Sequence, residues 1–159
     1  MSDKPWIFME PYHGGSHRHL AEGLVARLRG RRSIELWTLP ARTWKWRMRG
    51  AAIHFADRWR RERPEAAGIL VTSLLDAAAL RGLLPRDAAA LPFLLYCHEN
   101  QLNYPVRVDD KRDYHYGWTN IQSVAAADRS YWNSAYNLES FLAELPDFLS
   151  RMPDARPTD

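Results

Sequence analysis

Short runs of strand-forming residues recur along the chain and are separated by longer segments with helical spacing. The runs are Trp6–Met9, Ser33–Leu39, Gly68–Thr72, Phe93–Cys97 and Arg129–Trp132. Continuous apolar runs of this length are typical of strands that a parallel sheet buries on both faces. Strands that alternate with helices form βαβ units, whose crossovers place helices against the sheet. We therefore predict an α/β fold with a mostly parallel sheet and helices on both faces.

The helical segments carry recognisable start and stop signals. Ser16 is the predicted cap of the first helix and Gly30 its predicted end. A short helix is predicted over Leu74–Leu80, and Asn133 or Ser134 is predicted to cap the last helix. The residues of that last helix predicted to face inward are Leu138, Phe141, Leu142 and Leu145, before a new turn at Pro146.

The length of the chain suits one domain, which we place at residues 1–150. Residues 151–159 contain two prolines and no periodicity, as expected of a linker. No apolar run approaches the roughly 18 residues of a membrane span, so no membrane partner and a cytoplasmic location are expected. Cys97 is the single cysteine, which excludes an internal disulfide.

A polar, glycine-rich loop follows the first predicted strand. Its candidate ligand-binding residues are Glu10, Tyr12, Gly14, Gly15, Ser16 and His17. In open α/β sheets, ligands bind beyond the carboxyl ends of the strands, and the start of a helix offers free N–H groups to a phosphate or a sugar hydroxyl. The alternative is an ordinary turn between strand and helix. His13, His17 and His19 have no fourth ligand in register, so no metal site is predicted.

A second polar loop follows the run that ends at Cys97. Its candidate residues are His98, Glu99, Asn100, Gln101 and Tyr104. A histidine beside a carboxylate can orient a hydroxyl or transfer a proton near neutral pH, and we expect Glu99 to favour the protonated imidazole of His98. The alternative is a loop whose polar side chains only satisfy backbone groups.

Positive charge is concentrated between Arg42 and Arg63. Eight cations and two carboxylates leave this segment with a net charge of +6, against +3 for the whole chain. Arginine interleaved with tryptophan suits a nucleic acid, because cations meet phosphates and rings stack on unpaired bases. The candidate nucleic-acid-binding residues are Arg42, Trp44, Lys45, Trp46 and Arg47. The alternative, favoured for Arg58–Arg63, is a solvated helix whose tryptophans pack into the core.

Several motifs together resemble the tRNA-queuosine mannosyltransferase family. In chain order they are Glu10-x-Tyr12-x-Gly14-Gly15-Ser16-His17, Thr38-Leu39-Pro40-Ala41, Trp44-x-Trp46-Arg47, His98-Glu99-Asn100-Gln101-Leu102-x-Tyr104-Pro105, Tyr116-Gly117, Asn133-Ser134, Asn137-x-Glu139-Ser140-Phe141 and Pro153-Asp154-x-Arg156-Pro157. Each motif alone is weak, but in this order they cover nearly the whole chain. The match is to the amino-terminal domain of that family.

The resemblance implies a Rossmann-like acceptor-side domain, which is one half of a GT-B glycosyltransferase. It implies transfer of mannose from GDP-mannose to queuosine in a tRNA anticodon, with no cofactor and no required metal. The nucleotide sugar would be held mainly by a second domain, absent here, so this chain alone is expected to be inactive. His98 and Glu99 are the implied catalytic residues, and Asn133 joins the substrate-binding set. The alternative is a non-catalytic module that binds tRNA or a nucleotide.

Overall fold

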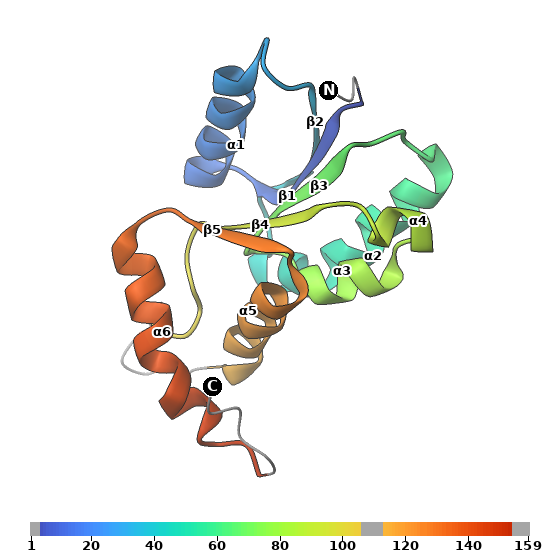
Figure 1. Cartoon of the computed structure of the whole chain (residues 1–159). Coiled ribbons are helices and arrows are strands. Elements are labelled where there is room, and N and C mark those ends of the chain that lie inside the picture. The colour runs from blue at the N-terminus through green and yellow to red at the C-terminus, as the bar shows by residue number, and fades with distance from the viewer. Residues whose placement is uncertain (1–3, 106–112, 154–159) are drawn as a thin grey trace.

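The protein contains one five-stranded parallel sheet, shown in Figure 1. The computed structural model describes residues 4–105 and 113–153. The strands are β1 (Trp6–His13), β2 (Ile34–Pro40), β3 (Gly68–Thr72), β4 (Phe93–Cys97) and β5 (Arg129–Trp132). Their order across the sheet is β2-β1-β3-β4-β5, and every neighbouring pair is parallel. The predicted α/β fold with a parallel sheet is confirmed.

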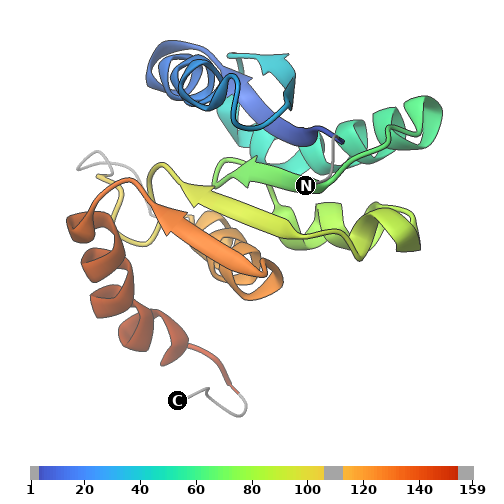
Figure 2. The same ribbon diagram turned by 45° about the horizontal axis from the view of Figure 1, so that its top comes forward.

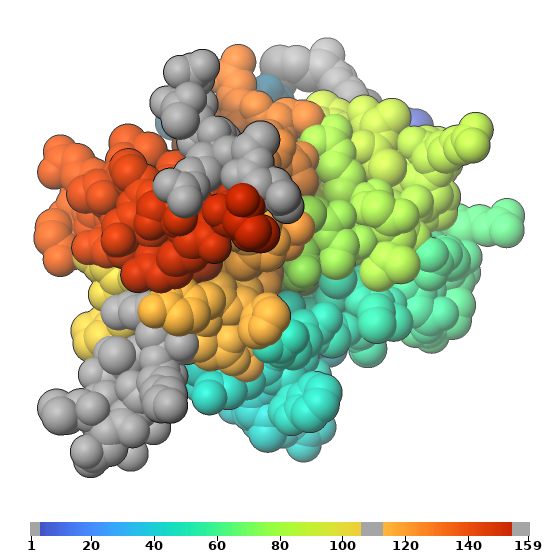
Figure 3. Space-filling view, turned by 90° about the horizontal axis from the view of Figure 1, so that it is seen from below, coloured from blue at the N-terminus to red at the C-terminus, as the bar shows by residue number. Residues whose placement is uncertain are grey.

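Helices cover both faces of this sheet. They are α1 (Gly15–Leu28), α2 (Trp44–Glu62), α3 (Ala77–Leu83), α4 (Arg86–Ala89), α5 (Tyr114–Ala126) and α6 (Ala135–Leu149). Helix α1 lies on one face against β1 and β2, whereas α2, α3 and α5 lie on the other (Figures 1 and 2). Figure 3 looks onto the second face, where α2, α3, α5 and α6 lie side by side. Among the described residues, no helix is long and apolar enough to cross a membrane.

The core lies between the sheet and the layer formed by α2, α3 and α5. Ile7 and Met9 of β1 point into it, and Phe55 and Trp59 of α2 meet them from the helix side. All four side chains are at most 4% exposed. Because side chains alternate along a strand, the intervening residue Phe8 faces the other side of the sheet, which α1 covers. The same alternation carries Glu10 to the α1 side.

Helix boundaries differ from the prediction where tertiary contacts intervene. Strand β1 continues to His13, with a register shift against β2 between Glu10 and His13. Gly14, in extended backbone, is the N-cap of α1, so the predicted capping role of Ser16 is wrong. Helix α3 begins later than predicted, because the Asp76 side chain accepts a hydrogen bond from the Ala79 N–H and caps it there. Ser134 caps α6 as predicted.

The predictions for Leu142 and Pro146 are both wrong. Phe141 takes the inward position beside the Trp132 ring, at 5.0 Å between centroids, so Leu142 is rotated outward and is 54% exposed. Pro146 lies inside α6 rather than starting a new turn. The last turn stays helical because Phe148 stacks on Trp118 of α5, at 6.2 Å. Residues 154–159 of the predicted linker lie outside the described residues.

Candidate active site at the carboxyl edge of the sheet

The two polar loops predicted from the sequence meet at the carboxyl edge of the sheet. His98, directly after β4, has its Nε2 atom 3.1 Å from the Ser16 hydroxyl oxygen at the start of α1. The rings of His98 and His17 are 4.5 Å apart between centroids. The contact between His98 and Ser16 joins residues 82 positions apart in the chain. The prediction that both loops lie at one edge is therefore confirmed.

Glu10 forms the base of the first loop. Its side chain is fully buried, and one carboxyl oxygen accepts a hydrogen bond from the Tyr12 N–H at 2.8 Å. The other oxygen lies 3.4 Å from Nδ1 of His17, whose side chain is itself buried. The Tyr12 ring meets the His17 ring edge-on at 5.8 Å. Glu10 has no exposed surface, so it holds the loop and the His17 ring from beneath.

The two histidines of the site have opposite pKa shifts. Burial lowers the pKa of His17, but the hydrogen bond and charge of Glu10, with the charge of Glu99, outweigh burial and raise it above its ordinary value. Burial also lowers the pKa of His98, and here the neighbouring His17 lowers it further while Glu10 opposes the shift, which remains downward. Protonation is therefore favoured on His17 and disfavoured on His98.

The expectation that Glu99 favours the protonated imidazole of His98 is wrong. Burial raises the pKa of Glu99, against the opposing charge of His17. The charge of Glu99 acts on His17, across the site, and not on the histidine beside it in the sequence. Adjacent residues at the end of a strand point in different directions, so sequence neighbours are not spatial partners here.

The rest of the second loop is held by hydrogen bonds. Asn100 is buried, and its amide donates to Oδ1 of Asn137 in α6 at 2.7 Å. The Gln101 amide donates to Glu99 Oε1 at 3.3 Å, and the Asn133 amide donates to the backbone oxygen of His98. For Asn100 and Gln101, the described contacts match the alternative of a hydrogen-bonded loop.

A small hollow of about 180 Å³ lies beside this loop. Its lining includes His98, Glu99, Tyr104 and Asn133. The Tyr104 side chain is 45% exposed at its rim. These four predicted site residues, three from the second loop and Asn133 after β5, therefore border one open space beside the start of α6.

Three buried polar atoms at the carboxyl edge of the sheet have no hydrogen-bond partner among the described residues. They are Nδ1 of His13, Nδ1 of His98 and the hydroxyl oxygen of Thr72, which ends β3 between the two loops. Unsatisfied buried polar atoms are rare and call for an explanation such as a ligand or a functional role. Thr72 was not among the predicted site residues, because a threonine at the end of an apolar run gives no separate signal.

Two buried asparagines that were not among the predicted site residues also order the loops. Asn137 donates to the Cys97 backbone oxygen at 3.0 Å, and Asn120 donates to the Ser73 backbone oxygen at the same distance. Each is at most 6% exposed. Asn137 belongs to a quoted motif, whereas Asn120 has no sequence signal beyond its place in a helical segment.

The candidate nucleic-acid-binding residues lie at the start of α2, near the same edge. The Trp44 ring packs on Tyr116 of α5 at 5.0 Å between centroids, whereas Trp46 is 74% exposed. The Arg47 side chain donates to the Pro40 backbone oxygen, and Lys45 lies 5.7 Å from the Trp44 ring. Only one of the two predicted stacking rings is therefore open to a base.

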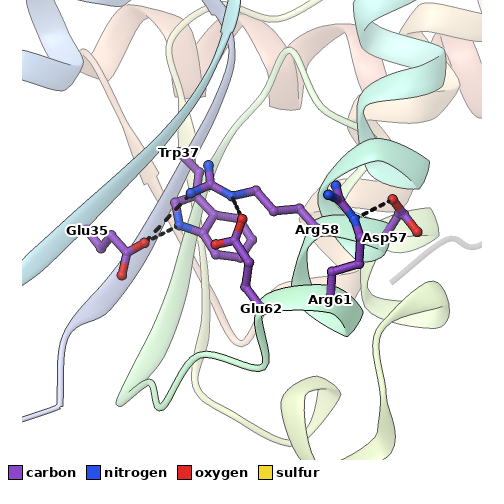
Figure 4. Close-up of polar contacts among 6 residues, drawn as sticks. All are labelled: Glu35, Trp37, Asp57, Arg58, Arg61 and Glu62. Carbon is purple, nitrogen blue, oxygen red and sulfur yellow. Dashed lines mark hydrogen bonds and ion pairs between the residues drawn. The ribbon is translucent and has the colours of Figure 1, made fainter.

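The far end of α2 matches the alternative of a solvated, core-packed helix. Figure 4 shows the residues concerned: Glu35, Trp37, Asp57, Arg58, Arg61 and Glu62. The Arg58 guanidinium lies 4.0 Å above the Trp37 ring and pairs with Glu62 at 2.8 Å. Arg61 pairs with Asp57 at 3.1 Å. Two of the eight cations of the segment are therefore paired with the two carboxylates that its net charge of +6 already includes.

The described residues include no group of three or more His, Cys, Asp or Glu side chains placed to hold a metal ion. His13 lies 3.4 Å from Glu22, and His17 faces Glu10 instead. The three histidines of the first loop and α1 therefore do not converge.

The fold is that of a Rossmann-like α/β domain, and its candidate site lies at the carboxyl edge of the parallel sheet, where ligands bind in open α/β folds. Residues 6–159 match the family described as tRNA-queuosine alpha-mannosyltransferase N-terminal, and the chain belongs to this family. It is 43% identical over 152 residues to a tRNA-queuosine alpha-mannosyltransferase of Drosophila melanogaster. That alignment covers 95% of this chain and 40% of the length of the relative. No solved structure matches the chain.

Proposed function

We propose that this chain is the acceptor-side domain of a GT-B mannosyltransferase that acts on queuosine in a tRNA anticodon. Membership of the family and the name of the Drosophila relative support this proposal. The observation that carries it is the contact between the two loops, where His98 meets Ser16 and His17 beside exposed polar groups. Glycosyl transfer needs groups that steady a departing diphosphate and groups that position an attacking hydroxyl at the same place.

The two histidines suit different parts of this reaction. In the proposed step, the bond between the anomeric carbon and the diphosphate breaks with its electron pair, and a hydroxyl oxygen of queuosine bonds to that carbon. His17, whose raised pKa favours the cationic form, would balance the diphosphate charge together with the free N–H groups at the start of α1. His98, whose lowered pKa favours the neutral form, would orient the acceptor hydroxyl and accept its proton.

Glu99 and Glu10 act through His17 in this proposal. Both raise the pKa of His17, and Glu10 also holds its ring. We therefore assign both carboxylates as positioning residues, whereas the sequence alone pointed to Glu99 as catalytic. A variant that keeps the shape and removes the charge, Glu10→Gln, is expected to shift the pH profile of transfer, which loss of packing alone does not do.

The donor and the cellular setting complete the proposal. GDP-mannose would be the donor, and the part of the full-length protein that corresponds to the other 60% of the relative would hold its nucleotide. The tRNA substrate would be met in the cytoplasm. The exposed ring of Trp46 and the cations Arg42 and Lys45 lie where an anticodon loop would approach the site.

The test is a transfer assay with the full-length protein, GDP-mannose and matched tRNAs. Mannose is expected to be transferred to tRNA that contains queuosine and not to the same tRNA with guanosine at that position. GDP-glucose serves as the donor control. Tight tRNA binding without transfer from any nucleotide sugar would contradict the proposal and favour a non-catalytic binding module.

A further inference from the structure

A second group of positive charges lies at the opposite edge of the sheet. Arg27 lies in the last turn of α1, and Arg29, Arg31 and Arg32 follow in the connection to β2. No aspartate or glutamate occurs between Gly23 and Ile34 in the sequence. Among the described residues, no carboxylate forms an ion pair with any of these four arginines. We call these four residues the α1–β2 arginine cluster.

The cluster contrasts with the arginines of α2. Three of the α2 arginines have acidic partners within 4 Å: Arg49 with Asp113, Arg58 with Glu62 and Arg61 with Asp57. Three of the eight cations of that segment therefore have acidic partners, whereas the four arginines of the shorter cluster keep their full charge of +4. An unpaired arginine is fully available to a phosphate, whereas a paired one must first lose its partner.

The cluster surrounds a concave surface. A hollow of about 740 Å³ is lined by Arg29, Arg31, Arg32 and Lys4, with Trp6 and Val25 among the apolar lining residues. Lys4 pairs with Glu65 at 3.5 Å, so the three arginines carry the open charge. Gly30, with a φ of +82°, makes the left-handed turn that separates Arg29 from Arg31. A concave cationic surface with an apolar base is suited to an anionic polymer.

Helix α1 connects this hollow with the candidate active site. Ser16 and His17 are in its first turn, and Arg29 follows its last residue. At 1.5 Å per residue, the two ends are about 20 Å apart. Figure 1 shows that the connection from α1 to β2 lies beside the N-terminal end of the described chain, away from the meeting point of the two loops.

We infer that the α1–β2 arginine cluster binds the phosphate backbone of the tRNA substrate at a distance from the reacting nucleoside. The inference rests on the proposed function. A ligand no larger than a nucleoside at the active site would not extend about 20 Å, whereas a paired RNA stem extends that far within on the order of ten phosphates. The charge, the concave shape and the position at the far end of α1 together indicate a second, sequence-independent contact with a long polyanion.

The test compares two triple variants of the full-length protein that remove the same charge. One variant carries Arg29→Gln, Arg31→Gln and Arg32→Gln. The control carries Arg61→Gln, Arg86→Gln and Arg129→Gln, which are exposed and lie outside the cluster. Affinity for whole tRNA is measured between about 50 and 200 mM salt, because each phosphate contact contributes close to one unit of salt slope.

The cluster variant is expected to bind whole tRNA about tenfold more weakly or worse, with a salt slope lowered by about 2 to 3. Transfer at saturating tRNA should stay within about twofold of wild type, because uniform binding affects KM and not kcat. For an isolated anticodon-loop oligonucleotide, the cluster and control variants should bind alike. Equal losses for the two variants with whole tRNA would overturn the inference.

Two further outcomes distinguish a failure of this inference from a failure of the proposed function. If wild-type protein binds tRNA but transfers no mannose, the proposed function fails, and the affinities still test the cluster. If the cluster variant loses binding to phosphatidylserine vesicles and keeps its tRNA affinity, the RNA assignment is wrong.

Discussion

At the scale of single residues, the site depends on two histidines with different surroundings. His17 is buried against Glu10, whereas His98 is partly exposed beside Ser16. Burial and the neighbouring His17 lower the pKa of His98. Their rings are in contact, so protonating both at once is unfavourable. Of the two rings, His17 is therefore the one on which protonation is favoured.

Replacing His98 by alanine or glutamine in the full-length protein should reduce transfer by about 10² to 10⁴-fold, if it accepts a proton from the acceptor. Melting temperature should change little, because within the described part of the chain the His98 side chain has one hydrogen bond, to Ser16. His19→Ala is the control, since His19 is exposed on α1. Parallel losses of activity and melting temperature would assign His98 to the scaffold.

His17 should give the protein a pH-dependent stability. Its pKa in the folded protein lies above the ordinary value of 6.5, so its stabilising contribution is complete below that pH and is lost as pH rises through the folded pKa. The difference in melting temperature between wild type and His17→Gln should therefore shrink from about pH 6 to pH 9. An NMR titration in which Glu10→Gln leaves the His17 pKa unchanged would contradict this account.

Trp44 and Trp46 should respond differently to replacement by alanine. Trp46→Ala should weaken tRNA binding by about 1 to 3 kcal/mol through lost stacking, with little change in stability. Trp44→Ala should lower stability, because its ring packs on Tyr116. The measurements are tRNA affinity and thermal melting for each variant. Unchanged tRNA affinity for Trp46→Ala would remove this residue from the interface.

At the scale of elements, close contact between the β1–α1 connection and the β2–α2 connection determines the geometry of the first loop. A Cβ atom placed on Gly14 would lie 2.4 Å from the Cβ of Ala41, which follows β2. The backbone of Gly14 is extended, so its conformation is open to any residue and only the contact with Ala41 requires glycine. The close approach holds the β1–α1 connection against the β2–α2 connection, from which the candidate nucleic-acid-binding residues begin.

Gly14→Ala should therefore destabilise the protein by about 1 to 3 kcal/mol, because backbone must move to admit the methyl group. The matched control is Gly23→Ala within α1, where a Cβ meets nothing within 4 Å. That substitution should stabilise the helix by up to about 1 kcal/mol. Chemical denaturation of both variants checks the pair, and the account fails if Gly14→Ala is neutral.

At the scale of the whole molecule, the sheet places the candidate site at one edge, and under the proposed function the nucleotide of the donor is bound by another domain. The chain spans 40% of the length of the relative it matches. The purified 159-residue chain is therefore expected not to transfer mannose from GDP-mannose, whereas the full-length protein does so under the same conditions. Turnover by the short chain alone would show that its own loops suffice for donor binding.

The sequence by itself determined the strands, their parallel arrangement and the two loops that carry the site. Runs such as Gly68–Thr72 and Phe93–Cys97 have lengths and compositions that suit only buried strands, and the crossover rule then sends their carboxyl ends to one edge. Each of these inferences rests on local pattern or on a general rule of topology, so no distant contact was needed.

Tertiary structure alone decided which side chains act on one another. Glu99 acts on His17 rather than on its neighbour His98, since direction at a strand end depends on the packed loop. Trp44 is covered and Trp46 is open, because α5 lies against one side of α2 and not the other. The same holds for charge. The number of cations follows from the sequence, but their availability to a ligand depends on which carboxylates the fold places beside them.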